Sequence, residues 1–216
     1  MICVVLYLYL EKLWFELGEN DTAMQLLDIQ IEEQPDRLEL RIWRTRQLLK
    51  MNRLDVCHSQ FDKIGSIDPN NKELLEMKAE LELRGETHEK NCIMMMAANH
   101  LKDALEQVEL AIGARPKYLK LFLLRAKIYR RLKLWEPALE NIELIKGSGD
   151  LVVEQESKEL VISIFNDLGV ECIYGGFYKE AIKLFSAAIH HVKTERKIYS
   201  NRLIIYVIFY INILKQ

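Results

Sequence analysis

Residues that interrupt helices are scarce in this 216-residue chain, which contains only 4 prolines and 9 glycines. Because proline and glycine mark most turns, their scarcity predicts short loops and few strands. Half of the residues are apolar. Leu, Ile, Glu, Lys and Ala dominate the sequence, and this composition favours α-helices.

The chain also lacks clustered cysteines and an excess of charge of one sign. No Cys-x-x-Cys pair occurs, which argues against a zinc site and a disulfide framework. The cysteines are Cys3, Cys57, Cys92 and Cys172. We expect reduced, buried thiols in an intracellular, cytoplasmic protein. The formal net charge of −2 gives no overall field that points to nucleic acid or a membrane.

Long apolar runs occur only near the two ends. Residues 1–10 (MICVVLYLYL) lack a basic region and a small-residue cleavage site, so we interpret them as the buried first helix of the first hairpin, not a signal peptide. Residues 203–214 form a 12-residue run, shorter than the roughly 20 residues of a membrane-spanning helix. The sequence therefore predicts no membrane span.

Similar residues recur in the sequence at a spacing of 34 positions. Ala104 and Ala138 are 34 residues apart, as are Pro35 and Pro69. The same spacing relates Leu101 to Trp135, Ala98 to Leu132, Met95 to Tyr129 and Leu105 to Leu139. Self-similarity at this period is typical of helical repeat arrays. Each hairpin cannot bury its apolar stripe alone, and stacking creates a continuous core and a long concave surface.

The residues that interrupt the helical pattern are of two kinds, which alternate along the chain. Gly or Asn breaks supply the left-handed residue that ends a helix, whereas Pro breaks end one hairpin and start the next. The pattern predicts an all-α fold, an α-solenoid of about five antiparallel helix hairpins within residues 1–202. The predicted units are residues 2–34, 38–67, 71–114, 118–147 and 156–193.

Two irregularities interrupt the period. Pro69 and Pro116 are 47 residues apart, so we expect the first helix of the third unit to extend to about 25 residues, with Gly85 as a site for a kink. Ala138 and Ala181 are 43 residues apart. We assign that surplus to the loop at 147–155 and an extra leading helical turn.

The units resemble tetratricopeptide repeats. The fifth unit matches best, with Leu168-Gly169 in its first helix, a Gly176-Phe177-Tyr178 turn, and Ala181 where two helices touch. The second unit departs from the pattern, with Cys57 where alanine is usual and Thr45 at a small-residue site. The resemblance implies a right-handed superhelix whose first helices line a concave face. It also implies an adaptor without known catalysis, with a link to cilia or sperm.

The tail departs from this pattern. After residue 202 a sixth hairpin should follow, but residues 203–216 are β-branched, aromatic and free of glycine. We interpret them as a helical segment that leaves its repeat through alternative splicing or a truncated gene model. The alternative is a capping helix on the fifth hairpin, although such caps normally have a polar outer face.

No set of residues points to catalysis, a metal or a cofactor. His190 and His191 are adjacent on a predicted helix, so their rings diverge and cannot share a metal. The glycine-rich segments 147–149 and 175–176 follow no strand and precede no Lys-Ser or Lys-Thr pair, so they are not phosphate loops. We expect no enzymatic activity, no cofactor and no small-molecule substrate.

Basic residues gather on two predicted first helices. Residues 115–133 contain eight basic residues and no acidic one. Helical counting, with the resemblance placing first helices on the concave face, directs Arg46 and Lys127 into the groove and Arg130 to its edge. Together with Arg131, these residues form a predicted site for an acidic peptide segment of a protein partner. The alternative is a solvated face balanced by the acidic helix at 73–89.

These observations favour a protein-interaction scaffold. One alternative is the repeat region of a longer protein whose activity lies outside this chain. Another is weak nucleic-acid binding through the basic helices, but these lack interleaved aromatic residues and the net charge is negative.

Overall fold

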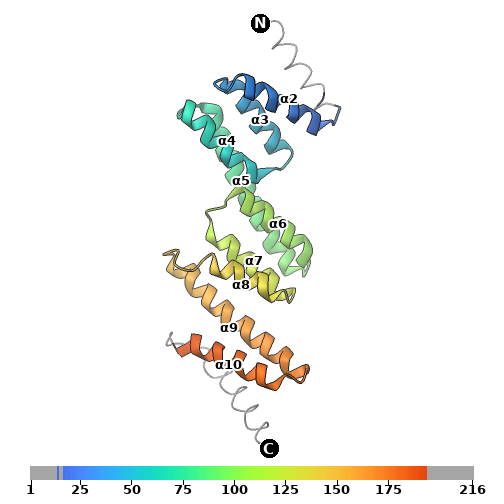
Figure 1. The fold of residues 1–216 in the computed structure, drawn as a ribbon, viewed down its shortest axis with the longest axis vertical. Coiled ribbons are helices and arrows are strands. Elements are labelled where there is room, and N and C mark those ends of the chain that lie inside the picture. The colour runs from blue at the N-terminus through green and yellow to red at the C-terminus, as the bar shows by residue number, and fades with distance from the viewer. Residues whose placement is uncertain (1–13, 15–16, 194–216) are drawn as a thin grey trace, which may run out of the picture. The chain divides into compact units, whose positions relative to one another are not determined.

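The computed structural model describes Trp14 and residues 17–193, and every element in that part of the chain is a helix (Figure 1). The all-α fold predicted from the sequence is thereby confirmed. The apolar runs at 1–10 and 203–214 lie outside the described residues. The helices are α2 (Asn20–Glu33), α3 (Leu38–Lys50), α4 (Leu54–Ile67), α5 (Lys72–Ala97), α6 (Leu101–Ala114), α7 (Leu119–Arg131), α8 (Trp135–Glu143), α9 (Leu151–Tyr174) and α10 (Tyr178–Lys193).

Left-handed residues separate the two helices of each hairpin. They are Asn52 (φ 58°), Asn99 (φ 63°), Lys133 (φ 61°) and Gly176 (φ 79°). Glycine and asparagine adopt this conformation at low cost. The turns at Asn52, Asn99 and Gly176 were therefore predicted from the sequence. Lys133 was not expected there, because lysine carries no local preference for positive φ. The long helix α5 has 26 residues and remains helical through Gly85.

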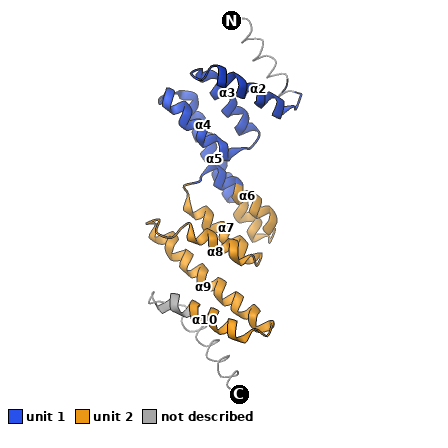
Figure 2. Ribbon diagram, viewed as in Figure 1, with its two compact units in different colours: residues 1–90, 110–116 blue, residues 91–109, 117–216 orange. Residues whose placement is uncertain are grey.

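The chain divides into two compact units (Figure 2). Unit 1 comprises residues 1–90 and 110–116. Its core contains the fully buried Leu27, Leu40, Leu48 and Ile64, together with Leu74. These side chains come from α2, α3, α4 and α5, so successive helices share one apolar interior, as expected for stacked hairpins.

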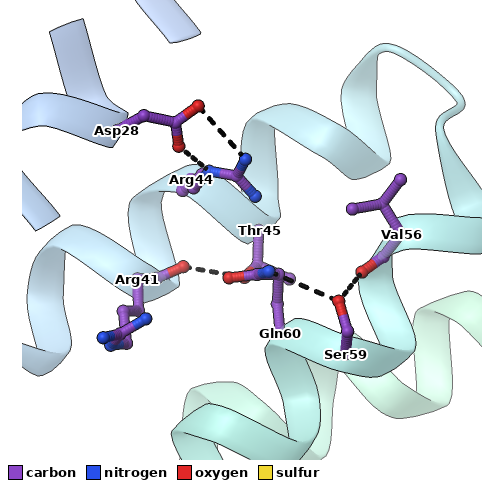
Figure 3. Close-up of polar contacts among 7 residues, drawn as sticks. All are labelled: Asp28, Arg41, Arg44, Thr45, Val56, Ser59 and Gln60. Atoms are coloured by element: carbon purple, nitrogen blue, oxygen red, sulfur yellow. Dashed lines mark hydrogen bonds and ion pairs between the residues drawn. The ribbon is translucent and has the colours of Figure 1, made fainter. Parts of the chain in front are cut away.

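The small side chains of unit 1 mark where its helices approach closely. Thr45 on α3 and Cys57 on α4 have no exposed surface. The Thr45 hydroxyl donates a 2.7 Å hydrogen bond to the Arg41 carbonyl of its own helix (Figure 3). The buried hydroxyl is thereby satisfied without a partner on another element. Thr45 therefore replaces a small apolar residue at little cost.

Unit 2 comprises residues 91–109 and 117–216. Leu123, Ala126, Ala138 and Ile145 form its core with buried residues of α9. A second cluster lies between α9 and α10, where Ala181 and Phe185 are buried against partly buried residues of α9. Ala138 lies at a position that the 34-residue spacing marked, and Ala181 lies at the helix contact that the resemblance implied.

One arginine–carboxylate pair recurs between hairpins. Arg44 of α3 bonds Asp28 of α2 at 2.6 Å (Figure 3), and Arg125 of α7 bonds Glu109 of α6 at 2.8 Å. Both arginines lie nine residues after a proline and 16 residues after their carboxylate. The pair therefore joins the second helix of one hairpin to the first helix of the next in both units.

Candidate functional site

A groove of about 400 Å³ lies in unit 2 between the first helices α7 and α9. The end of α5 contributes Met96 to its wall. The lining residues are Met96, Lys127, Arg130, Arg131, Glu156, Glu159, Leu160, Ile162 and Ser163. Leu160 is 5% exposed and belongs to the core of the unit, so the groove combines charged walls with a buried apolar base.

Two ion pairs cross between α7 and α9. Lys127 Nζ lies 2.8 Å from Glu156 Oε2, and Arg130 Nε lies 2.8 Å from Asp167 Oδ2. The two acidic residues are 11 positions apart on α9, which corresponds to about 16 Å of helix. Lys127 and Arg130 are only three positions apart, so their side chains diverge and reach α9 at well-separated points. The remaining α9 residues of the groove lie between these points.

Arg131 differs from the other two cations of this groove because its partners are neutral. It donates to the Met96 carbonyl at 2.6 Å and to Asn99 Oδ1 at 2.9 Å. The guanidinium thus caps the C-terminal end of α5, where carbonyl groups lack helical partners. Among the described residues no carboxylate lies within ion-pair distance of Arg131. Its positive charge remains uncompensated at an exposed wall.

A smaller groove of about 200 Å³ lies in unit 1 between α3 and α5. It is lined by Arg46, Leu49, Lys50, Glu73, Glu76, Met77 and Glu80. Arg46 Nη2 lies 2.6 Å from Glu73 Oε2, and both side chains are 46% exposed. Arg84 pairs with Glu80 at 2.6 Å and also donates to the Leu49 carbonyl at the end of α3.

Each cation predicted for partner binding lines a groove, but they lie in separate units. Arg46 lines the α3–α5 groove, whereas Lys127, Arg130 and Arg131 line the α7–α9 groove. Glu73 pairs with Arg46, consistent with the alternative of a charge-balanced face. The acids that balance Lys127 and Arg130 come from α9 and not from residues 73–89.

Sequence reasoning missed the acidic side of the unit 2 groove. Glu156, Glu159, Leu160 and Ser163 follow the i, i+3, i+4, i+7 spacing of one helix face. That signal was present in the sequence. To use this spacing one must know where α9 begins and which of its faces points to α7. The 43-residue distance from Ala138 to Ala181 departs from the repeat period and hides both.

The described residues contain no group of three or more His, Cys, Asp or Glu side chains arranged to hold a metal ion. The Cys57 thiol is enclosed by the core, and burial raises its pKa to about 11. A thiol with so high a pKa is a poor nucleophile at neutral pH. None of the described helices has the length and apolar character needed to cross a membrane.

The geometry is that of a helical repeat protein. Successive helix hairpins share apolar cores, and grooves lie between their first helices. No protein-family model matches the chain. The chain is 20% identical to human tetratricopeptide repeat protein 16 over 190 residues, which are 86% of this chain and 22% of that protein. The macaque (Macaca fascicularis) protein of the same name matches to the same extent. This similarity agrees with the resemblance to tetratricopeptide repeats that the repeat spacing carries.

The chain spans about a fifth of the length of these relatives. Among solved structures, a tetratricopeptide repeat protein from Parabacteroides merdae aligns with a TM-score of 0.36 and 14% identity over 93% of this chain and 68% of that one. A thermophilic repeat protein from Thermus thermophilus has a TM-score of 0.29 and 18% identity over 97% and 98%.

Proposed function

We propose that this chain is a non-catalytic scaffold that binds a peptide segment of a protein partner in the α7–α9 groove. The observation that carries the proposal is Arg131, an exposed cation on the groove wall whose bonded partners are neutral. A carboxylate of the partner would give this guanidinium a charge-assisted hydrogen bond. The expected partner segment therefore contains an acidic side chain.

The two ion pairs that cross the groove do not prevent this binding. Lys127 and Glu156 are 41% and 46% exposed, and Arg130 and Asp167 are each 35% exposed. Exposed pairs of this kind contribute roughly 0–1 kcal/mol each, so an incoming carboxylate can replace Glu156 or Asp167 at small cost. The separation of about 16 Å along α9 accommodates about five extended residues at roughly 3.3 Å each.

Site-specific cross-linking tests the proposal. A photoreactive residue at Ser163, which lines the groove, should capture partner proteins. The same residue at Leu144, which is 61% exposed on the segment after α8, serves as the matched control. The double charge reversal Lys127→Glu and Arg130→Glu should abolish the Ser163-specific products, whereas Lys146→Glu should not.

The proposal fails if the Ser163 and Leu144 positions capture the same proteins, or if the double reversal leaves the capture unchanged. Circular dichroism of each variant separates loss of binding from loss of folding. The buried Cys57 and Cys92 are free thiols, which supports an intracellular location as part of the proposal. Because the matched part is 22% of the relative's length, the proposed role is that of this segment.

A further inference from the structure

The two grooves are built from residues at matching positions. Counted from Pro35 and from Pro116, the first helices contribute positions 11, 14 and 15 to each groove. These positions are Arg46, Leu49 and Lys50 in unit 1, and Lys127, Arg130 and Arg131 in unit 2. The facing helix contributes four residues at identical spacing: Glu73, Glu76, Met77 and Glu80 in unit 1, and Glu156, Glu159, Leu160 and Ser163 in unit 2.

In both grooves the cation at position 11 forms an ion pair with the first glutamate of the facing helix. Arg46 bonds Glu73 at 2.6 Å, and Lys127 bonds Glu156 at 2.8 Å. The first cation and the first glutamate therefore face each other in both grooves. Both grooves therefore share two cations and two glutamates at matching positions, and in both the first cation and the first glutamate form a salt bridge.

Each groove also retains one cation without a carboxylate. Arg131 bonds a carbonyl and an amide oxygen. Lys50 occupies the matching position, and its ammonium lies 5.9 Å from the centre of the Trp43 ring. Among the described residues neither cation has a carboxylate within ion-pair distance.

The second glutamate of each groove is weakly held. Glu159 accepts a long 3.4 Å hydrogen bond from the Gln155 amide. Glu76 lies 3.7 Å from Lys72 on its own helix, with side chains 60% and 89% exposed. An exposed contact of this kind contributes little. Each groove thus keeps one positive and one negative group available to a ligand.

We infer that the two grooves are two copies of one binding site, each selecting a peptide segment with both an acidic and a basic side chain. The acidic side chain bonds Lys50 or Arg131, and the basic side chain bonds Glu76 or Glu159. This inference rests on the proposed function and extends it. The segment bears charges of both signs, and one chain binds two such segments.

Among the matching positions, two differ in charge between the grooves. Leu49 stands where unit 2 has Arg130, and Glu80 stands where unit 2 has Ser163. Glu80 is bonded by Arg84 and Arg130 by Asp167, so neither adds an unpaired charge. The unit 2 groove is about twice as large, and we expect it to bind more tightly.

The test uses the full chain and end-blocked, fluorescein-labelled heptapeptides. Two probes contain one Glu and one Lys in opposite orders, Gly-Glu-Leu-Gly-Leu-Lys-Gly and its reverse. Two further probes carry Glu or Lys at both charged positions. Fluorescence anisotropy and isothermal titration should show that the better mixed-charge probe binds at least fivefold more tightly than either single-sign probe. The stoichiometry should be two peptides per chain.

Glutamine substitutions then assign the two sites. Arg131→Gln retains a donor for the Met96 carbonyl, and both Arg131→Gln and Lys50→Gln should reduce the stoichiometry from two to one. The double variant should bind none, while Lys146→Gln should bind two. A stoichiometry of one in the parent chain, equal binding of single-sign probes, or no binding of any probe up to 1 mM overturns the inference. The proposed function is decided separately by cross-linking at Ser163, so it can stand when the inference fails.

Discussion

The ring of Phe185 in α10 lies directly against Gly169 in α9. A Cβ atom on Gly169 would lie 2.7 Å from Cε1 of that ring and 2.8 Å from Cζ. Phe185 is 2% exposed, so its ring cannot move outward without losing buried contacts. Gly169→Ala should therefore lower the free energy of unfolding by about 1–3 kcal/mol, as overpacked cores do, and urea denaturation followed by circular dichroism measures the change.

Gly65 in α4 is the matched control for this substitution. A Cβ there would lie 3.7 Å from Leu74 Cδ2, which is an ordinary van der Waals contact. Gly65→Ala should leave stability unchanged or raise it by up to about 1 kcal/mol, because alanine is the better helix former. If both variants lose stability equally, the Phe185 contact is not what sets the cost of a side chain at Gly169.

The sequence predicted those features of the fold that follow from residue preferences and from the repeat spacing. The 34-residue spacing predicted helix hairpins and marked Ala104 and Ala138, which are both buried. Gly176 was marked as a turn because glycine favours positive φ. Lys133 could not be marked, since its left-handed conformation (φ 61°) is imposed by the flanking helices α7 and α8.

The groove was predictable on one side only. Lys127 and Arg130 were identified because basic residues cluster in one first helix. Their partners Glu156 and Asp167 belong to another helix, and ion pairing between helices depends on packing distance and phase. A single sequence does not specify that phase when the connecting loop departs from the period, as it does before α9.

Arg125 links two hairpins and should contribute more to stability than the exposed pairs. Its side chain is 17% exposed, and it bonds Glu109 at 2.8 Å and Asn141 Oδ1 at 2.7 Å. Arg125→Ala leaves the buried Asn141 without this donor, so we expect a loss of about 1–3 kcal/mol. Thermal and urea denaturation measure the loss.

A double-mutant cycle separates the ion pair from the packing of the arginine stem. The cycle combines Arg125→Ala with Glu109→Gln and is compared with the equivalent cycle for the more exposed Lys127 and Glu156. We expect a larger coupling energy for the Arg125 pair, with the exposed pair below about 1 kcal/mol. Equal coupling energies would contradict a special role of this arginine.

Asp150 begins the longest first helix of unit 2. Its carboxylate accepts hydrogen bonds from the Val152 and Val153 amides at 3.1 Å each. Asp150→Ala should cost about 1 kcal/mol by leaving these amides without the cap, and Asp150→Asn should restore most of that stability. Hydrogen exchange of the first turn of α9 should accelerate in the alanine variant. Unchanged exchange at Val152 and Val153 would show that the cap does not hold the helix end.

Cys57 should make stability depend on pH in the alkaline range. Burial raises the pKa of its thiol from 9.0 to about 11, so the folded chain holds this proton where the unfolded chain releases it. The stability contributed by the neutral thiol is therefore complete below pH 9 and declines as the pH rises toward 11. The measurement is the difference in urea midpoint between the parent chain and Cys57→Ala, from pH 8 to pH 11.

Other side chains titrate in the same range, and the difference between the two proteins removes their contribution. Alanine is usual at this position in the repeats that the sequence resembles, so Cys57→Ala should fold and lose little stability at pH 8. The urea midpoint of the parent chain should fall steadily relative to that of Cys57→Ala above pH 9. A difference that stays constant to pH 11 would show that the Cys57 thiol ionises at the same pH in the folded and unfolded chains, which is incompatible with its complete burial between α4 and its neighbours.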